Sequence, residues 1–138
     1  MNNKECQKLI DHLLGDYVVD SEISGSYVYI EINIDNLLRA LTILATSSTI
    51  LFSSLFDLFA VDYRKKQGYI CLYYHLHSFK IDKSIFVLVK LQKNLDIQSV
   101  TILFRNAEWY EREVFEKIGV NLSTIQICVR SFLFCKET

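Results

Sequence analysis

Hydrophobic residues follow two different periods along the chain. Over residues 4–14 they recur every three or four positions, which predicts a short amphipathic helix, and Gly15 follows where helices commonly end. Residues 26–33 alternate between apolar and other side chains, which is typical of a strand with one more apolar face. Residues 36–46 carry a broad apolar stripe behind Asp35, a good N-cap residue, so we expect a helix that packs on a sheet.

The second half of the chain predicts further strands and another helix. Residues 53–63 are ambiguous by period, and only their second half is expected to be a strand. Residues 69–79 and 84–91 are rich in aromatic and β-branched side chains around a short charged connection, which indicates neighbouring antiparallel strands. Asn106 is the expected N-cap of a helix over residues 107–118, whose charged residues match the helix dipole.

The chain has no internal repeat, low-complexity tract or Gly/Ser/Pro-rich linker, which favours a single folded unit. Its 138 residues, of which 51% are hydrophobic and 22% charged, exclude disorder along the whole chain. The net charge of −1 gives no support for a nucleic-acid partner. The longest uncharged stretch, residues 40–56, is shorter than the roughly 20 residues that span a bilayer, so we expect a buried core segment and no membrane span.

Composition also indicates a partner and a compartment. The mean hydropathy of +0.19 is high for a free monomer, which favours a permanent protein partner. The four cysteines lack the close spacings of metal or redox sites, so we expect buried thiols in a reducing compartment. The polar N-terminus carries no secretory signal. The absence of proline, with an excess of residues that have A- and T-rich codons, favours an organellar or endosymbiont gene.

Candidate chemistry is limited to a few residues. Cys71, Tyr73, His75 and His77 share one strand face, but Cys71 and His75 would stand about 13 Å apart, too far to share a metal ion. At most the two histidines could contribute ligands, and the favoured interpretation is neutral histidines that are hydrogen-bonded at a packed interface. The sequence has no GxSxG, GxGxxG or GxxxxGK[ST] motif, so catalysis by this chain alone is not expected.

A helical wheel of residues 107–118 separates two surfaces. Glu111 falls among the apolar residues, where an unpaired carboxylate would cost several kcal/mol, so we expect it to have a hydrogen-bonding partner. Trp109 falls on the polar side together with three charged residues, Arg112, Glu113 and Glu116. This grouping is typical of an anchor at a protein interface. The alternative is that Trp109 folds back over the loop before the helix.

The same helix carries a sequence signature. Residues 107–116, AEWYEREVFE, followed by Gly119 and Val120, closely resemble the pattern A-x-W-x-E-R-E-V-[YF]-D-x-x-G-I of the thirty-kilodalton subunit family of respiratory complex I. Upstream, residues 62–63 and 74–76 resemble the family's D-Y and Y-H-L. Glu116 stands where the family has Asp, and the residues after Val120 match none of the family motifs that follow.

The resemblance implies an α+β domain of two layers, a mixed β-sheet covered by helices, over residues 1–122, with residues 123–138 as a divergent C-terminal extension. It implies a non-catalytic structural subunit in the hydrophilic arm of a proton-translocating NADH:ubiquinone oxidoreductase. Such a subunit binds no cofactor itself, since FMN and the iron–sulfur clusters belong to partner subunits. The implied partners are the large quinone-site subunit and neighbouring iron–sulfur subunits, on the mitochondrial matrix side or the bacterial cytoplasmic side of the membrane.

The residues expected at the interface with these partners are Trp109, Glu111, Arg112, Glu113, Glu116, Tyr63 and His75. Two alternatives stay open from the sequence. One is the equivalent subunit of a membrane-bound hydrogenase complex. The other is a free-standing homo-oligomeric binding domain with a ligand site at His75 and His77.

Overall fold

The structure, a computed structural model, describes residues 2–63, 68–92 and 100–118. In chain order its elements are α1 (Asn3–Leu14), β1 (Val18–Ser24), β2 (Tyr27–Ile32), α2 (Leu37–Thr46), β3 (Ser54–Asp62), β4 (Tyr69–Ser78), β5 (Lys83–Gln92) and α3 (Ala107–Ile118). Two short 3₁₀ helices, η1 (Gly15–Tyr17) and η2 (Ile34–Asn36), precede β1 and α2. The predicted extension over residues 123–138 lies outside the described residues.

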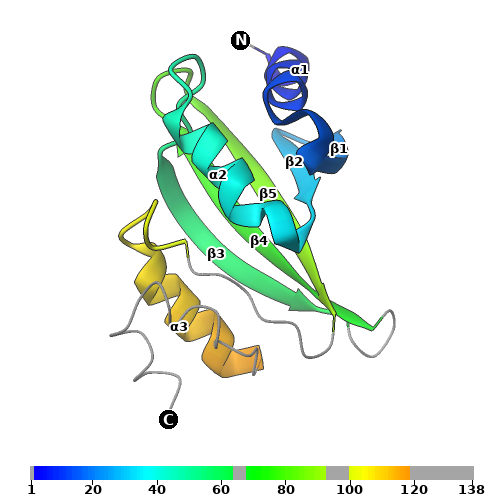
Figure 1. The fold of residues 1–138 in the computed structure, drawn as a ribbon, viewed down its shortest axis with the longest axis vertical. Coiled ribbons are helices and arrows are strands. Elements are labelled where there is room, and N and C mark those ends of the chain that lie inside the picture. Colours follow the sequence, from blue (N-terminus) through cyan, green and yellow to red (C-terminus); the bar gives the residue numbers. More distant parts are fainter. Residues whose placement is uncertain (1, 64–67, 93–99, 119–138) are drawn as a thin grey trace.

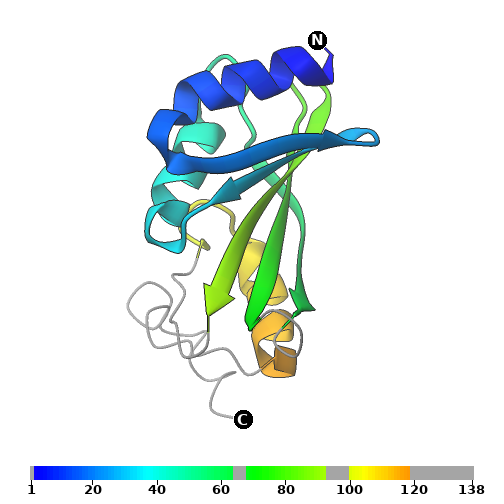
Figure 2. The same ribbon diagram turned by 90° about the vertical axis from the view of Figure 1, so that its right-hand side faces the viewer.

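The strands form one sheet in the order β1-β2-β5-β4-β3. The β2–β5 pair is parallel and the other pairs are antiparallel, so the sheet is mixed. The helices α1 and α2 lie over one face of this sheet, and α3 runs beside β3 (Figure 1 and Figure 2). Buried residues of all three helices join the sheet in one hydrophobic core. The predicted α+β architecture is confirmed.

Alternation along β4 separates the core from the opposite face of the sheet. Tyr74 is completely buried in the core, together with its neighbours on the same face of the strand. Cys71, Tyr73, His75 and His77 point the other way, as their shared parity predicts. We call this side, away from the core, the outer face. Its aromatic residues contact one another across the strands: Tyr27, Tyr29, Phe56, Phe59, Tyr73, His75, His77 and Phe86.

Two strands differ from their prediction. The hydrophobic pattern does not indicate β1, because this strand at the edge of the sheet is mostly exposed and contains Asp20, Ser21 and Glu22. The strand β3 covers all of Ser54–Asp62, so the first half of that segment is a strand as well. A register shift between Leu55 and Asp57 interrupts its alternation, which explains why its period is ambiguous.

The start of α2 also differs from its prediction. Asp35 is not the N-cap, because the side chain of Asn33 accepts a hydrogen bond from the backbone N–H of Asp35 at 3.0 Å and caps η2 instead. The helix α2 then begins at Leu37, and Asn36 at its cap position makes no side-chain capping hydrogen bond. The local turn chemistry of an asparagine therefore outcompetes the predicted aspartate cap.

Residues 40–56 contribute to the buried core, as predicted, although Leu51 and Phe56 remain partly exposed. They run from α2 through a turn into β3. Among the residues that the structure describes, no helix is long and apolar enough to cross a membrane. The segment contributes these buried side chains: Ala40, Leu41, Leu44, Ile50, Phe52 and Leu55.

Candidate interaction surfaces

The solvent side of α3 carries a cluster of large side chains. Trp109 is 66% exposed, so its ring is not buried against the loop before the helix. The Arg112 guanidinium lies 5.3 Å from the centroid of the Trp109 ring, within range of a cation–π interaction. The same guanidinium is 3.5 Å from the Glu108 carboxylate one turn earlier. We call Glu108, Trp109 and Arg112 the α3 surface.

Two hydrogen bonds hold α3 against the edge of the sheet. The Asn106 side-chain amide donates to the carbonyl of Leu55 at 2.8 Å, and the Tyr110 hydroxyl donates to the carbonyl of Phe56 at 2.9 Å. Both acceptors belong to β3. Since the contacts lie one helical turn apart along α3, they fix the rotation of the helix about its axis. The α3 surface therefore faces solvent in a defined orientation.

Glu111 lies on the opposite side of α3 and is completely buried. Its Oε2 atom accepts a hydrogen bond from the backbone N–H of Val100 at 2.9 Å. The Tyr74 hydroxyl is also buried, and burial, reinforced by the nearby Glu111 charge, raises the pKa of Tyr74 well above its usual range. The predicted hydrogen-bonding partner of Glu111 is thus confirmed. Its predicted place at the interface needs correction, because its side chain lies wholly inside the chain and can affect the surface only through α3.

The other predicted interface residues occupy different parts of the molecule. Glu113 is exposed and lines a cavity between α3 and β3. Tyr63 and His75 belong to the outer face of the sheet, where Tyr63 contacts the ring of Tyr69 at 5.5 Å. The side chain of Glu116 lies outside the described residues. The structure therefore brings Trp109 and Arg112 together and divides the predicted set between two surfaces.

His75 sits in an aromatic cluster on the outer face. Its ring stacks on Phe86 at 4.6 Å and meets the edges of Tyr27 and Phe56 at 5.8 and 5.7 Å. Burial lowers the pKa of His75, the Asp57 carboxylate opposes this shift, and His77 adds to it. Its buried Nε2 atom has no hydrogen-bond partner within the described residues, so the hydrogen bond predicted for this histidine is not found at that nitrogen.

Near His75, the side chains of Tyr73 and Cys71 interact with each other on the outer face. The Tyr73 ring stacks on Phe59 at 5.0 Å. Burial is the main cause that raises the pKa of Tyr73, and interactions with Cys71 and Tyr63 add to it. Burial likewise raises the pKa of the Cys71 thiol, in agreement with the prediction of a buried thiol. None of these groups is set up as a nucleophile.

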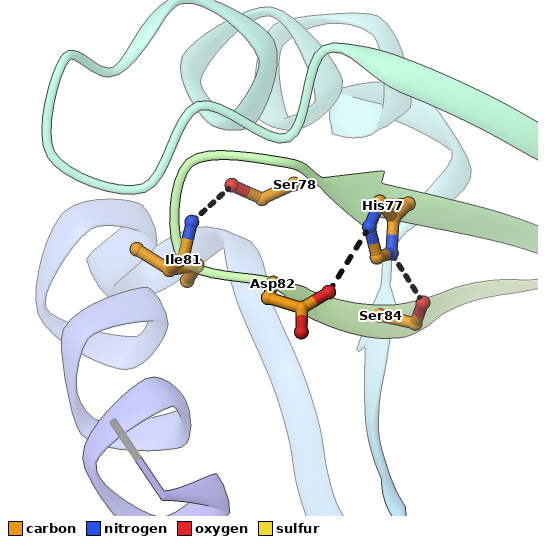
Figure 3. A network of polar contacts seen from close by, with 5 residues as sticks. All are labelled: His77, Ser78, Ile81, Asp82 and Ser84. Carbon is orange, nitrogen blue, oxygen red and sulfur yellow. Dashed lines mark hydrogen bonds and ion pairs between the residues drawn. The ribbon is translucent and has the colours of Figure 1, made fainter.

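His77, Ser84 and Asp82 form a constellation that sequence reasoning missed (Figure 3). The His77 Nδ1 atom is 2.8 Å from the Ser84 hydroxyl, and its Nε2 atom is 3.8 Å from the Asp82 carboxylate. The residue types are those of a catalytic triad, but the Asp82 side chain is 96% exposed, so solvent screens its long contact with the imidazole. Finding the pair requires the strand register, because His77 and Ser84 face each other across β4 and β5. The contacts cross-link the two strands.

Among the residues that the structure describes, no group of three or more His, Cys, Asp or Glu side chains is arranged to hold a metal ion. The His75 ring stacks on an aromatic ring, and the His77 ring is hydrogen-bonded to the Ser84 hydroxyl. The structure therefore favours a packing role for both histidines.

We predict that Glu111→Ala lowers the free energy of unfolding of the chain by about 1–3 kcal/mol, because the buried N–H of Val100 loses its acceptor. Glu111→Gln keeps an acceptor oxygen and is expected to cost less. The matched control is Glu108→Gln on the α3 surface, with an expected change within about 0.5 kcal/mol. Urea unfolding of the three variants measures these differences, and a Glu111→Ala variant as stable as the control would contradict the inward role of the carboxylate.

The lowered pKa of His75 predicts a pH dependence of stability. The unfolded chain binds a proton at this residue near pH 6.5, whereas the folded chain resists protonation until a lower pH. The stabilising contribution is therefore complete above about pH 6.5 and is lost as the pH falls through the folded pKa. NMR titration of the His75 ring measures the folded value directly, and a midpoint at or above 6.5 would refute the prediction.

Comparison with known proteins identifies the family. Residues 30–133 match the family model described as respiratory-chain NADH dehydrogenase, 30 Kd subunit, and this match runs past the expected boundary at residue 122. An NADH-quinone oxidoreductase subunit from Parvibaculum lavamentivorans is 31% identical over 121 residues, which cover 84% of this chain and 60% of that protein. NADH-ubiquinone oxidoreductase subunit 9 of Reclinomonas americana is 32% identical over 104 residues, covering 75% of this chain and 51% of that protein.

Among solved structures, a chain of the membrane-bound sulfane sulfur reductase, an archaeal respiratory membrane complex, shares the fold with a TM-score of 0.74 at 23% identity. The similarity covers 87% of this chain and 69% of that one. The chain spans at most about 60% of the length of the curated relatives named above. With the family match extending over most of its residues, the chain belongs to the family of the 30 kDa subunit of the respiratory-chain NADH dehydrogenase.

Proposed function

We propose that this chain is a non-catalytic structural subunit of the hydrophilic arm of respiratory complex I. Its contribution is positional: it holds the quinone-site and iron–sulfur subunits in the geometry that electron transfer from NADH to quinone requires. The observation that carries the proposal is the α3 surface, which lies in the segment matched to the family and exposes a tryptophan beside an arginine. Tryptophan and arginine are the residues most enriched at the energetic centres of protein interfaces.

The proposed partners are the large quinone-site subunit and the neighbouring iron–sulfur subunits. FMN and the iron–sulfur clusters are assigned to those subunits, and none to this chain. The names of the relatives, NADH-quinone and NADH-ubiquinone oxidoreductase, support an assembly that oxidises NADH. Its place is the matrix side of a mitochondrial membrane or the cytoplasmic side of a bacterial one.

Purification of the tagged full chain from native membranes tests the assembly. The expected result is co-purification with flavin, iron–sulfur clusters and NADH dehydrogenase activity. Co-purification with hydrogen-dependent activity instead would assign the chain to a hydrogenase complex. A stable colourless oligomer of this chain alone would contradict both assignments and favour a free-standing binding domain.

We predict that Trp109→Ala or Arg112→Ala lowers the yield of assembled complex and leaves the domain folded. Truncation of an interface anchor commonly costs about 2 kcal/mol or more, equivalent to a loss of affinity of about thirtyfold. The matched control is Val19→Ala, which truncates another apolar side chain that is 57% exposed, on β1 at the edge of the sheet opposite β3. Native gel electrophoresis measures assembly and urea unfolding measures folding. An isolated Trp109→Ala chain that unfolds, or equal losses of assembly for Trp109→Ala and Val19→Ala, would contradict the anchor role.

A further inference from the structure

The strand β3 forms one edge of the sheet, and its backbone groups point outward at known positions. The N–H of Tyr63 donates to the carbonyl of Tyr69 at 2.9 Å, so this pair is a hydrogen-bonded pair between β3 and β4. Hydrogen-bonded pairs recur at every second residue of the strand, so Val61 and Phe59 also bond to β4. Leu58 and Ala60 alternate with them in non-hydrogen-bonded positions, and their N–H and C=O groups face away from β4. The N–H of Leu58 agrees with this direction, since it bonds to the carboxylate of Asp57 at 2.8 Å.

Side chains of α3 already take up the first outward groups of this edge. Asn106 and Tyr110 donate to the carbonyls of Leu55 and Phe56. Beyond Tyr110 the helix continues alongside β3 (Figure 1). A cavity of about 240 Å³ lies there between the two elements, lined by Asp57, Leu58, Phe59, Ala60, Tyr110, Glu113 and Val114. We call this cavity the edge groove.

The two walls of the edge groove have different chemistry. One wall is the outward backbone of β3, where the N–H of Leu58 is bonded to Asp57 and no described strand pairs with the C=O of Leu58 or with the N–H and C=O of Ala60. Such an edge is a template for another strand. The other wall is the side of α3 at Val114, which is apolar and mostly buried. Carboxylates of Asp57 and Glu113 stand at the groove, one from each wall. A groove between an edge strand and a helix is the arrangement that binds extended peptides by strand addition.

We propose that the edge groove binds an extended, basic segment of a partner protein, which pairs with β3 as an additional strand of the sheet. Backbone hydrogen bonds to the C=O of Leu58 and to the N–H and C=O of Ala60 hold the segment. Its apolar side chains, at every second residue, face Val114, and a lysine or arginine lies near Asp57 and Glu113. This site is separate from the α3 surface, and it does not depend on which respiratory complex contains the chain.

Peptide binding to the full chain tests the proposal. The probe is the blocked peptide Ac-(Val-Lys)₃-NH₂, with Ac-(Val-Glu)₃-NH₂ and a form N-methylated at alternate residues as comparisons. The expected result is saturable binding with slower amide exchange at Ala60. The comparison peptides are expected to bind about tenfold more weakly or worse, because they lose charge complementarity or strand hydrogen bonds. No binding of the lysine peptide, or equal binding of the N-methylated form, would overturn the proposal.

Variants of the chain separate the groove from other surfaces. Glu113→Lys is expected to weaken binding of the lysine peptide about fivefold, because it replaces attraction by repulsion. Glu22→Lys makes the same charge change on β1 at the opposite edge of the sheet and is expected to have no effect. Ala60→Pro removes one outward N–H that bonds to no group of β4, and urea unfolding checks that this variant folds. The chain could instead associate with itself in the absence of peptide. If Ala60→Pro abolishes that association, the edge belongs to a second copy of the chain, and the proposed occupant is overturned.

Discussion

The attachment of α3 to the sheet is the constraint on which the proposed interactions depend. Asn106 and Tyr110 bind the helix to carbonyls of β3, and Glu111 binds its inner side to the backbone at Val100. These polar contacts fix the rotation of α3, which an apolar stripe alone fixes only loosely, because hydrophobic contacts are not directional. The same contacts therefore expose Trp109, bury Glu111 and set the width of the edge groove.

The other consequence of the architecture is that no described helix covers the outer face of the sheet. The described helices join a single core on one side of the sheet, so the opposite side presents aromatic rings that contact one another. Phe56 and Phe59 keep 43% and 37% of their surface exposed, although large aromatic side chains contribute most when they are buried. The high mean hydropathy of the chain thus has a structural source, and it agrees with a protein that works inside an assembly.

The sequence predicts those features that depend on a single element. The wheel of α3 places Trp109 outside and Glu111 inside because a regular helix repeats every 3.6 residues, and both positions are confirmed. The motif on that helix also leads to the correct family. Features that depend on two elements are missed. The contact between His77 and Ser84 requires the register of β4 and β5, and the edge groove requires α3 beside β3, which are about fifty residues apart in the chain. The strand β1 is missed because an exposed edge strand leaves little hydrophobic signal.

Hydroxyl-radical footprinting of Trp109 tests the role of the α3 surface most directly, since this residue is the only tryptophan of the chain and stands 66% exposed when the chain is alone. Mass spectrometry compares its oxidation in the isolated chain with its oxidation in the complex purified from native membranes. If α3 is a docking surface, oxidation of Trp109 falls severalfold in the complex, whereas the exposed Val19 on β1 serves as the internal reference. Equal oxidation of Trp109 in both samples would mean that no partner covers this helix, and the scaffold role assigned to it would be wrong.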